Sequence, residues 1–220
     1  MSIISNGNVI IDSGAIDNNE IDTHHLVDVS VTNAKIADST IQLAKLSATG
    51  TKDATTFLRG DNTFAGAGIT SASQFRLTTS FTGDASPIVS NWEEVDTDGY
   101  GRLGTAVSQS SGIFTFPATG IWHIISVMTH IEGSAAVQYA LNKIQTTENN
   151  SSYGDASVSY NNMSGNGYYQ TTSANFIFDV TDTSTHKIRL STNSNDASTT
   201  TMGDSDRNRT YMTFIRLGDT

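Results

Sequence analysis

The sequence contains no cysteine, only 2 prolines in 220 residues, and no long apolar run. Without cysteine, disulfides, thiolate nucleophiles and Cys-ligated zinc sites are all excluded. No stretch of about 18 apolar residues is present to form a membrane-spanning helix. The first residues also lack the basic and the unbroken apolar segments of a signal peptide. We therefore expect a soluble protein, without membrane insertion, that is stabilised by burial, hydrogen bonding or oligomerisation.

Basic residues are scarce as well, with 12 Lys and Arg against 22 Asp and Glu and a formal net charge of -10. No dense Lys/Arg cluster occurs, so nucleic acid is not an expected partner. The chain is instead rich in Gly, Ser, Thr, Asn and Asp, which suits strands joined by turns. The composition thus predicts an all-β protein.

An aliphatic residue recurs every five residues along the N-terminal part of the chain. A helix would repeat every 3.6 residues and a strand every 2, so a period of five indicates units that turn once per repeat. One chain is too short to stack enough such units, whereas three chains wound round a common axis would bury three aliphatic side chains in each layer. We predict an intertwined trimeric β stalk; the alternative is a disordered polar tether. Its trimer core would consist of Ile11, Ile16, Ile21, Leu26, Val31, Ile36, Ile41 and Leu46.

The composition divides the chain into three parts: residues 1–50 with the repeat, a neck at 51–69 rich in Gly, Ala and Thr, and a head at 70–220. The neck contains the tripeptide Arg59-Gly60-Asp61, which integrins recognise in animal extracellular proteins. We expect a structural turn there, with Arg59 paired to Asp61 of a neighbouring chain. An adhesion loop is the alternative.

Two segments, VTNAKIADSTIQLAKLSATGT (31–51) and TTFLRGDNTFAG (55–66), resemble pieces that recur in tail-fibre and other appendage proteins of marine and cyanobacterial tailed phages. The similarity covers about residues 15–66. It implies a virion surface location, trimerisation and an architectural role. Residues 1–15 would then dock on a capsid or tail protein of the phage.

The head shows short apolar runs separated by turn residues, as in an all-β sandwich. In GIWHIISVMTHIE (120–132) both alternating sets of residues are largely apolar, so this strand should be covered on one face by its own sandwich and on the other by a second subunit. The clearest candidate strands are 74–81, 112–118, 120–132, 137–146, 174–181, 186–193 and 210–218.

The segment GIFTFPATGIWHIISV (112–127) resembles the hairpin shared by the jelly-roll heads of the complement first-component and tumour necrosis factor families. The aromatic last strand, TYMTFIRLGDT, is similar too, while the polar segment 147–170 departs from the pattern. The resemblance implies a ten-stranded jelly roll on a three-fold axis that binds through distal loops. Residues expected in the head core or its interface are Phe114, Phe116, Trp122, Phe176, Phe178 and Phe214.

The histidines offer no clear metal or catalytic site. His123 and His130 are seven residues apart in one strand and should point to opposite faces. His24 and His25 lie in the stalk, where three copies could converge on the axis and bind a transition metal; a hydrogen-bonded surface pair is the alternative.

Two aspartate pairs have a spacing that calcium favours: Asp96 with Asp98, and Asp204 with Asp206. Neither motif supplies the remaining ligands of a calcium loop. Turn-forming aspartates explain both motifs without a metal. We predict no cofactor.

No nucleophile elbow, metalloprotease helix or phosphate loop is present, and the adjacent Glu93 and Glu94 would face opposite ways in a strand. We therefore predict that the protein is not an enzyme. A polysaccharide depolymerase tailspike is the alternative, because carboxylates from different strands can converge without any sequence motif.

Tyrosines in a polar, Asn- and Ser-rich stretch are candidates for receptor contact, because tyrosine rings stack on sugars at low entropic cost. The alternative is that they cap the sandwich. These residues are Tyr153, Tyr160, Tyr168 and Tyr169.

Together these features predict a homotrimeric appendage of a tailed phage whose head meets the host surface, with a surface glycan as candidate receptor. A capsid decoration or cement trimer that stabilises the head shell is the second hypothesis, and the depolymerase is the third.

Overall fold

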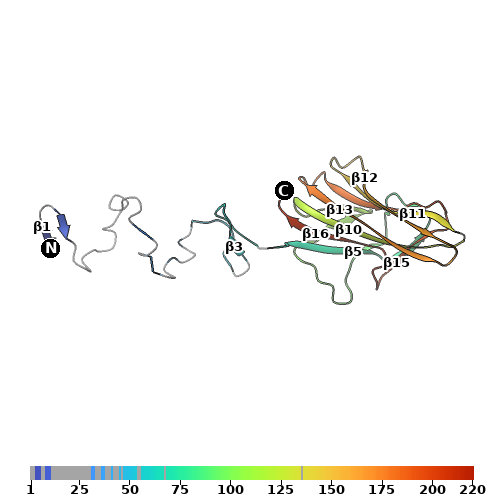
Figure 1. The fold of residues 1–220 in the computed structure, drawn as a ribbon, viewed down its shortest axis with the longest axis horizontal. Helices are drawn as coiled ribbons and strands as arrows, with labels where there is room; N and C mark the ends of the chain where they lie inside the picture. The colour runs from blue at the N-terminus through green and yellow to red at the C-terminus, as the bar shows by residue number, and fades with distance from the viewer. Residues whose placement is uncertain are drawn as a thin grey trace. The chain divides into compact units, whose positions relative to one another are not determined.

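The computed structural model describes the backbone of residues 3–5 and 8–10, together with residues 31–32, 36–37, 41, 45, 47–53, 56–66, 68–134 and 136–220. The chain forms two compact units, Met1–Ala65 and Gly66–Thr220, and its regular elements in the described residues are all strands (Figure 1). An all-β structure was predicted, and the strands confirm it.

The N-terminal unit contains two short β-pairs. One joins β1 (Ile3–Ser5) to β2 (Asn8–Ile10), and the other joins β3 (Thr56–Leu58) to β4 (Phe64–Gly66). Of the proposed stalk core, Ile11, Ile16, Ile21, Leu26 and Leu46 lie outside the described residues, as do His24 and His25. The described members Val31, Ile36 and Ile41 are 51%, 38% and 55% exposed in the single chain.

The Arg-Gly-Asp tripeptide lies in the turn between β3 and β4. The Arg59 amide donates to the Thr63 carbonyl at 2.8 Å, and Asp61 Oδ1 accepts hydrogen bonds from the Thr63 amide and hydroxyl. These bonds, that from the hydroxyl foremost, lower the pKa of Asp61. The ion pair of Arg59 with Asp61, at 3.7 Å, is made within one chain. It was expected between chains.

Twelve strands form the head unit. They are β5 (Ser71–Leu77), β6 (Thr79–Thr82), β7 (Trp92–Glu94), β8 (Ser108–Ser110), β9 (Ile113–Thr115), β10 (Gly120–Ile131), β11 (Val137–Thr147), β12 (Gly154–Met163), β13 (Tyr169–Val180), β14 (Lys187–Ser191), β15 (Thr200–Asp204) and β16 (Tyr211–Gly218).

The strands make two antiparallel sheets. Sheet I has the order β6-β15-β10-β16-β5-β7, and β13 also pairs with β10. Strands β15 and β16 pair with different parts of β10, whereas β13 pairs along its whole length. Sheet II has the order β12-β11-β14-β9-β8. Eight of the strands pair in a nested way, from the outside inwards: β5 with β16, β9 with β14, β10 with β13, and β11 with β12. Successive pairs alternate between the two sheets, which is the topology of a jelly roll.

The hydrophobic core lies between the two sheets. Sheet I contributes Trp122 and Phe214, sheet II contributes Phe114, and all three are fully buried. The rings of Phe114 and Phe214 lie 5.3 Å apart and join the sheets. Phe116 and Phe178 are also buried there, and Phe176 packs against the cluster with partial burial.

Strand β10 alternates strictly between buried and half-buried residues over its whole length. Its even-numbered residues face the core, as the complete burial of Trp122 and His130 shows. His123 is half-buried on the opposite face. The two histidines therefore point to opposite sides of the sheet.

Strand β12 lies inside the segment 147–170, which the sequence pattern left without a strand. It is an edge strand of sheet II. Ala156, Val158 and Tyr160 alternate with polar residues, but none of the three is fully buried. Ser159 on the other face bonds the hydroxyl of Thr172 on β13. The apolar alternation is too short to mark the segment as a strand. The short strands β7, β8 and β15 were not predicted either, because they too lack a sustained apolar period.

Candidate functional site

A pocket of about 430 Å³ lies over β5, on the face of sheet I that points away from the hydrophobic core. On β5, Phe75 and Leu77 face the core, so Gln74 and Arg76 point outwards. Two loops, 95–100 and 206–208, form the walls. They cover Arg76 so completely that only 1% of the residue is exposed.

The guanidinium of Arg76 is the anchor of this region. Its Nε donates to Glu93 at 2.6 Å, its Nη1 to the Thr97 hydroxyl at 2.8 Å, and its Nη2 to Asp96 at 2.7 Å. A buried charge without partners is strongly unfavourable, so these three bonds hold the 93–97 segment over β5. Because Glu93 and Asp96 are both acidic, they also neutralise the charge of Arg76.

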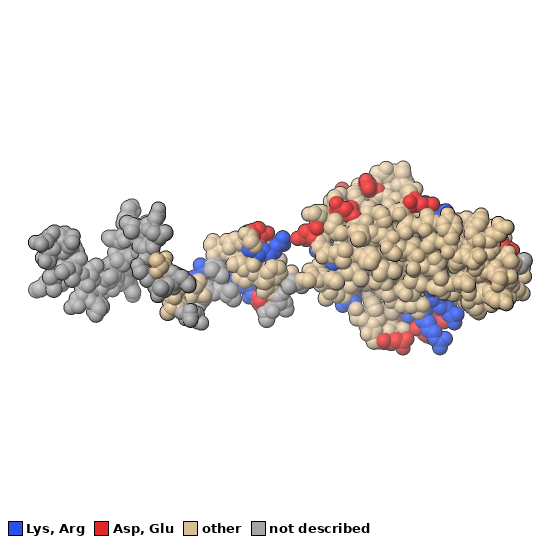
Figure 2. Space-filling model, in the orientation of Figure 1, with Lys and Arg blue, Asp and Glu red and all other residues tan. Residues whose placement is uncertain are grey.

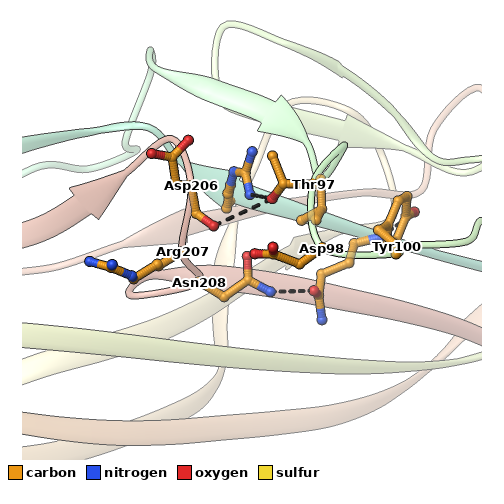
Figure 3. A pocket seen from close by; sticks show the side chains of 10 residues that line it. Thr97, Asp98, Tyr100, Asp206, Arg207 and Asn208 are labelled. Carbon is orange, nitrogen blue, oxygen red and sulfur yellow. Dashed lines mark hydrogen bonds between the residues drawn. The ribbon is translucent and has the colours of Figure 1, made fainter.

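The second loop is tied to the first. The hydroxyl of Thr97 donates to the Asp206 carbonyl at 3.3 Å, and the Asn208 side-chain amide donates to Gln74 Oε1. Figure 3 shows these two bonds on either side of the pocket. Both loops are thus fixed to β5 and to each other.

Tyr100 forms a further wall. Its hydroxyl donates to Glu94 at 3.0 Å and accepts the Gln74 backbone amide at 3.1 Å. Burial, together with the neighbouring Glu94 carboxylate, raises the pKa of Tyr100. The ring is therefore neutral and rigidly placed at ordinary pH.

Asp98 is presented by a tight turn in the first loop. The Tyr100 amide donates to the Thr97 carbonyl at 3.1 Å, and the two central residues, Asp98 and Gly99, have φ values of 54° and 78°. Positive φ at both central positions is typical of a type I′ turn. In Figure 3 Asp98 and Asn208 face each other across the pocket, whereas Asp206 and Arg207 point away from them.

The two aspartate pairs with calcium-like spacing do not combine into a cation site. Asp96 is bound to Arg76. Asp204 accepts the amides of Asp206 and Arg207 and pairs with Arg209 at 3.0 Å; the Asp206 amide foremost, and then Arg209, lower the pKa of Asp204. Among the described residues no group of three or more His, Asp or Glu side chains could hold a metal ion.

The four candidate receptor tyrosines are spread over the head. Tyr153 stacks on Arg189, with the guanidinium 4.1 Å from the ring centre, and its hydroxyl is buried without a partner among the described residues. Burial raises its pKa. Tyr160 lies on β12 and Tyr169 opens β13, so Tyr168 alone of the four belongs to the connection between these strands. The polar stretch that contains them is therefore divided between strands and their connections.

Exposure separates the same residues. Tyr160, Tyr168 and Tyr169 are 68%, 58% and 54% exposed near the β12–β13 turn. Tyr153 precedes β12 at the other end of that strand. Tyr160, Tyr168 and Tyr169 are therefore available for contact, whereas Tyr153 is stacked on Arg189.

His130 is a completely buried histidine in sheet I. Its Nε2 bonds the Thr192 hydroxyl at 3.0 Å and its Nδ1 bonds the Asn161 side-chain amide at 3.1 Å. Burial lowers the pKa of His130 to about 4. It is a neutral link between the sheets and has no carboxylate partner among these bonds.

No pattern in the sequence indicates the pocket. Arg76 was included only as one residue of a candidate strand, and the bonds that bury it come from segments separated from it by 17 to 21 residues. The only local signal was the Asp-Thr-Asp-Gly turn at 96–99. This motif forms one wall of the pocket, although it was noted only for its calcium-like spacing and as a turn.

No family model matches the chain, and no curated protein matches it. Among solved structures, it is similar to murine APRIL at pH 8.0, with a TM-score of 0.47 and 12% identity over 67% of this chain and 98% of that chain. The pH 8.5 structure of murine APRIL gives a TM-score of 0.47 and 14% identity over the same shares. The jelly-roll assignment rests on the nested strand pairing. In the described residues no helix is long and apolar enough to cross a membrane.

Proposed function

We propose that this protein is a homotrimeric, non-enzymatic surface appendage of a tailed phage, which attaches to the virion by its N-terminus and displays the jelly-roll head to the host. The observation that carries the proposal is the outward face of sheet I. Along β10 this face presents Ile121, Ile125 and Val127, which stay half-buried in the single chain. A sheet face turned to water normally alternates to polar residues.

The apolar character of this face continues onto the neighbouring strands. His123 of β10 is flanked by Ile177 of β13 and Ile215 of β16, and Ile177 is 60% exposed. Covering the rest of one such side chain is worth about 1–2 kcal/mol. A second copy of the chain is the proposed cover of β10, β13 and β16, because closed symmetric assemblies repeat the same contact in every subunit. Strand β5 on the same face is covered by the chain's own loops 95–100 and 206–208 and is not part of this contact.

The N-terminal repeat supports the same stoichiometry. Val31, Ile36 and Ile41 are exposed in the single chain, and each belongs to the five-residue series. Three chains around one axis would bury them together. The phage assignment is supported by the resemblance of residues 15–66 to appendage proteins.

The interface is tested by placing a charge on it. Ile177→Asp should lower the melting temperature of the assembly and make it dissociate at low concentration, because three carboxylates would be buried per trimer. Val89→Asp is the matched control, since Val89 is 55% exposed in a loop outside sheet I. Equal effects of the two substitutions would contradict the assignment of this face.

The location is tested on intact particles. Gold-labelled antibody against the head should decorate the particle surface, and the purified chain should compete with particles for adsorption to host cells. Labelling of the capsid without competition would instead support the decoration trimer. Release of soluble polysaccharide by the purified chain would contradict the non-enzymatic role.

A further inference from the structure

The pocket over β5 is built as a ligand site of a definite chemical class. We propose that it binds a neutral saccharide, with Asp98 and Asn208 accepting hydrogen bonds from neighbouring sugar hydroxyls. This proposal deepens the proposed function in host attachment, because it names the kind of molecule that the head would recognise.

The pocket is preorganised without a ligand. Arg76 fixes the first loop through hydrogen bonds to Asp96 and Thr97, and Thr97 and Asn208 fix the second loop. Ordering a loop on binding weakens affinity, so walls that are already fixed favour recognition of a small molecule. The volume of about 430 Å³ falls in the range of small-ligand sites.

The free groups that face each other across the pocket, on Asp98 and Asn208, are acceptors. In the described part of the chain the Asp98 carboxylate takes part in no hydrogen bond or ion pair. Asn208 uses its amide nitrogen on Gln74, which leaves its carbonyl oxygen facing Asp98 in Figure 3. Two neighbouring acceptors, one of them charged, complement adjacent hydroxyl groups, because charge-assisted hydrogen bonds are the stronger ones.

Charge excludes the competing ligand classes. Glu93 and Asp96 already neutralise Arg76, and Arg207 points away from Asp98, so an anionic sugar or a phosphate would meet a net negative wall. A calcium ion would find one free carboxylate instead of the several oxygen ligands that it requires. In Figure 2 the charged side chains of the head gather along its upper and lower margins, and most of the face between them carries none.

Tyr100 supplies the apolar part of the site. Its ring lines the pocket and is held by hydrogen bonds of its hydroxyl to Glu94 and Gln74. Aromatic rings stack on the C–H face of sugars. Acceptors on one wall and a ring on another thus match the two kinds of surface on a neutral saccharide.

The test uses the full chain, fluorescently labelled, on an array of neutral, sialylated and sulfated oligosaccharides, including bacterial surface polysaccharides. We expect binding to a subset of neutral glycans that a calcium chelator does not abolish. Binding confined to charged glycans, binding lost on chelation, or no binding to any glycan would each overturn the proposal.

Variants then assign the binding to the pocket by titration of the best neutral glycan. Asp98→Asn keeps the shape of the side chain and the turn, and Asn208→Ala removes the second acceptor; each should raise the Kd at least tenfold. The matched controls are Glu148→Gln and Asn166→Ala, which are exposed residues outside the pocket and should leave the Kd within twofold. Unchanged affinity in both pocket variants, with melting temperatures like the wild type, would refute the assignment.

The same variants separate this inference from the proposed function. If Asp98→Asn abolishes glycan binding but still competes fully with particles for adsorption, the saccharide site stands and its role in attachment fails. If the wild type competes for adsorption but binds no glycan, attachment stands and the saccharide site fails.

Discussion

The buried imidazole of His130 should make the stability of the head depend on pH. Its folded pKa is about 4 against about 6.5 in an unfolded chain, so below about pH 6.5 the unfolded state binds more protons than the folded state. The free energy of unfolding therefore falls as the pH falls from about 7 to about 4. Linkage gives a total loss of about 3 kcal/mol, of which about 2 kcal/mol is lost between pH 7 and pH 5.

This window separates His130 from the acidic groups with shifted pKa values. Burial raises the pKa of Glu132, but hydrogen bonds from Ser198, the Ser134 backbone and Thr199 lower it on balance. A lowered carboxyl pKa contributes stability that is present above about pH 4.5 and lost below it. Loss between pH 7 and pH 5 thus reports on histidine.

The assay is urea unfolding at pH 7 and pH 5, at one fixed chain concentration because assembly contributes to stability. His130→Gln should unfold at lower urea than the wild type at pH 7 but show little further loss at pH 5. His123→Gln, on the opposite face of the same strand, should keep the pH dependence of the wild type. If His130→Gln loses as much stability between the two pH values as the wild type, the reasoning is refuted.

Three further predictions concern packing and backbone conformation. Trp122→Ala should lower the free energy of unfolding by about 3–5 kcal/mol in chemical denaturation, because it empties a fully buried site; a loss under 1 kcal/mol would contradict its place in the core. Gly112→Ala should lower the melting temperature far more than Gly99→Ala. Both glycines have positive φ, but an added Cβ at Gly112 would lie 2.1 Å from the Ile88 carbonyl oxygen, whereas a Cβ at Gly99 would meet no atom within 4 Å. Equal melting temperatures would contradict this. Arg76→Met should leave the jelly roll folded while amide exchange in residues 95–100 speeds up, because two hydrogen bonds to the loop and one to Glu93 of β7 are lost; unchanged exchange would show that the loop is held by other contacts.

The sequence carried the information for the central strands because they are apolar runs bounded by turn residues. The predicted strand 120–132 exceeds β10 by one residue, and the aromatic residues of 112–118 precede it as expected. Strand β12 was missed, because only Ala156, Val158 and Tyr160 alternate with polar residues in a segment otherwise rich in serine and asparagine. Resemblance of a hairpin predicted the jelly roll; the nested pairing of first strand with last is a long-range property that periodicity does not encode.

The pocket was beyond sequence reasoning for a physical reason. Arg76 is buried only because two loops from distant parts of the chain close over it. Asp98 and Asn208 are 110 residues apart, and the strand order of sheet I alone brings them together. The tyrosines of the polar stretch show the same limit: they are close in sequence, but the length of β12 separates Tyr153 from the other three.

The claim on which the account depends most is that three chains assemble. The direct measurement is the mass of the full chain in solution by light scattering over a range of concentrations. Three chains of 23.5 kDa predict a particle of about 70 kDa that persists on dilution. A particle of 23.5 kDa at every concentration would contradict the trimer, and with it both the proposed stalk and the proposed cover of sheet I.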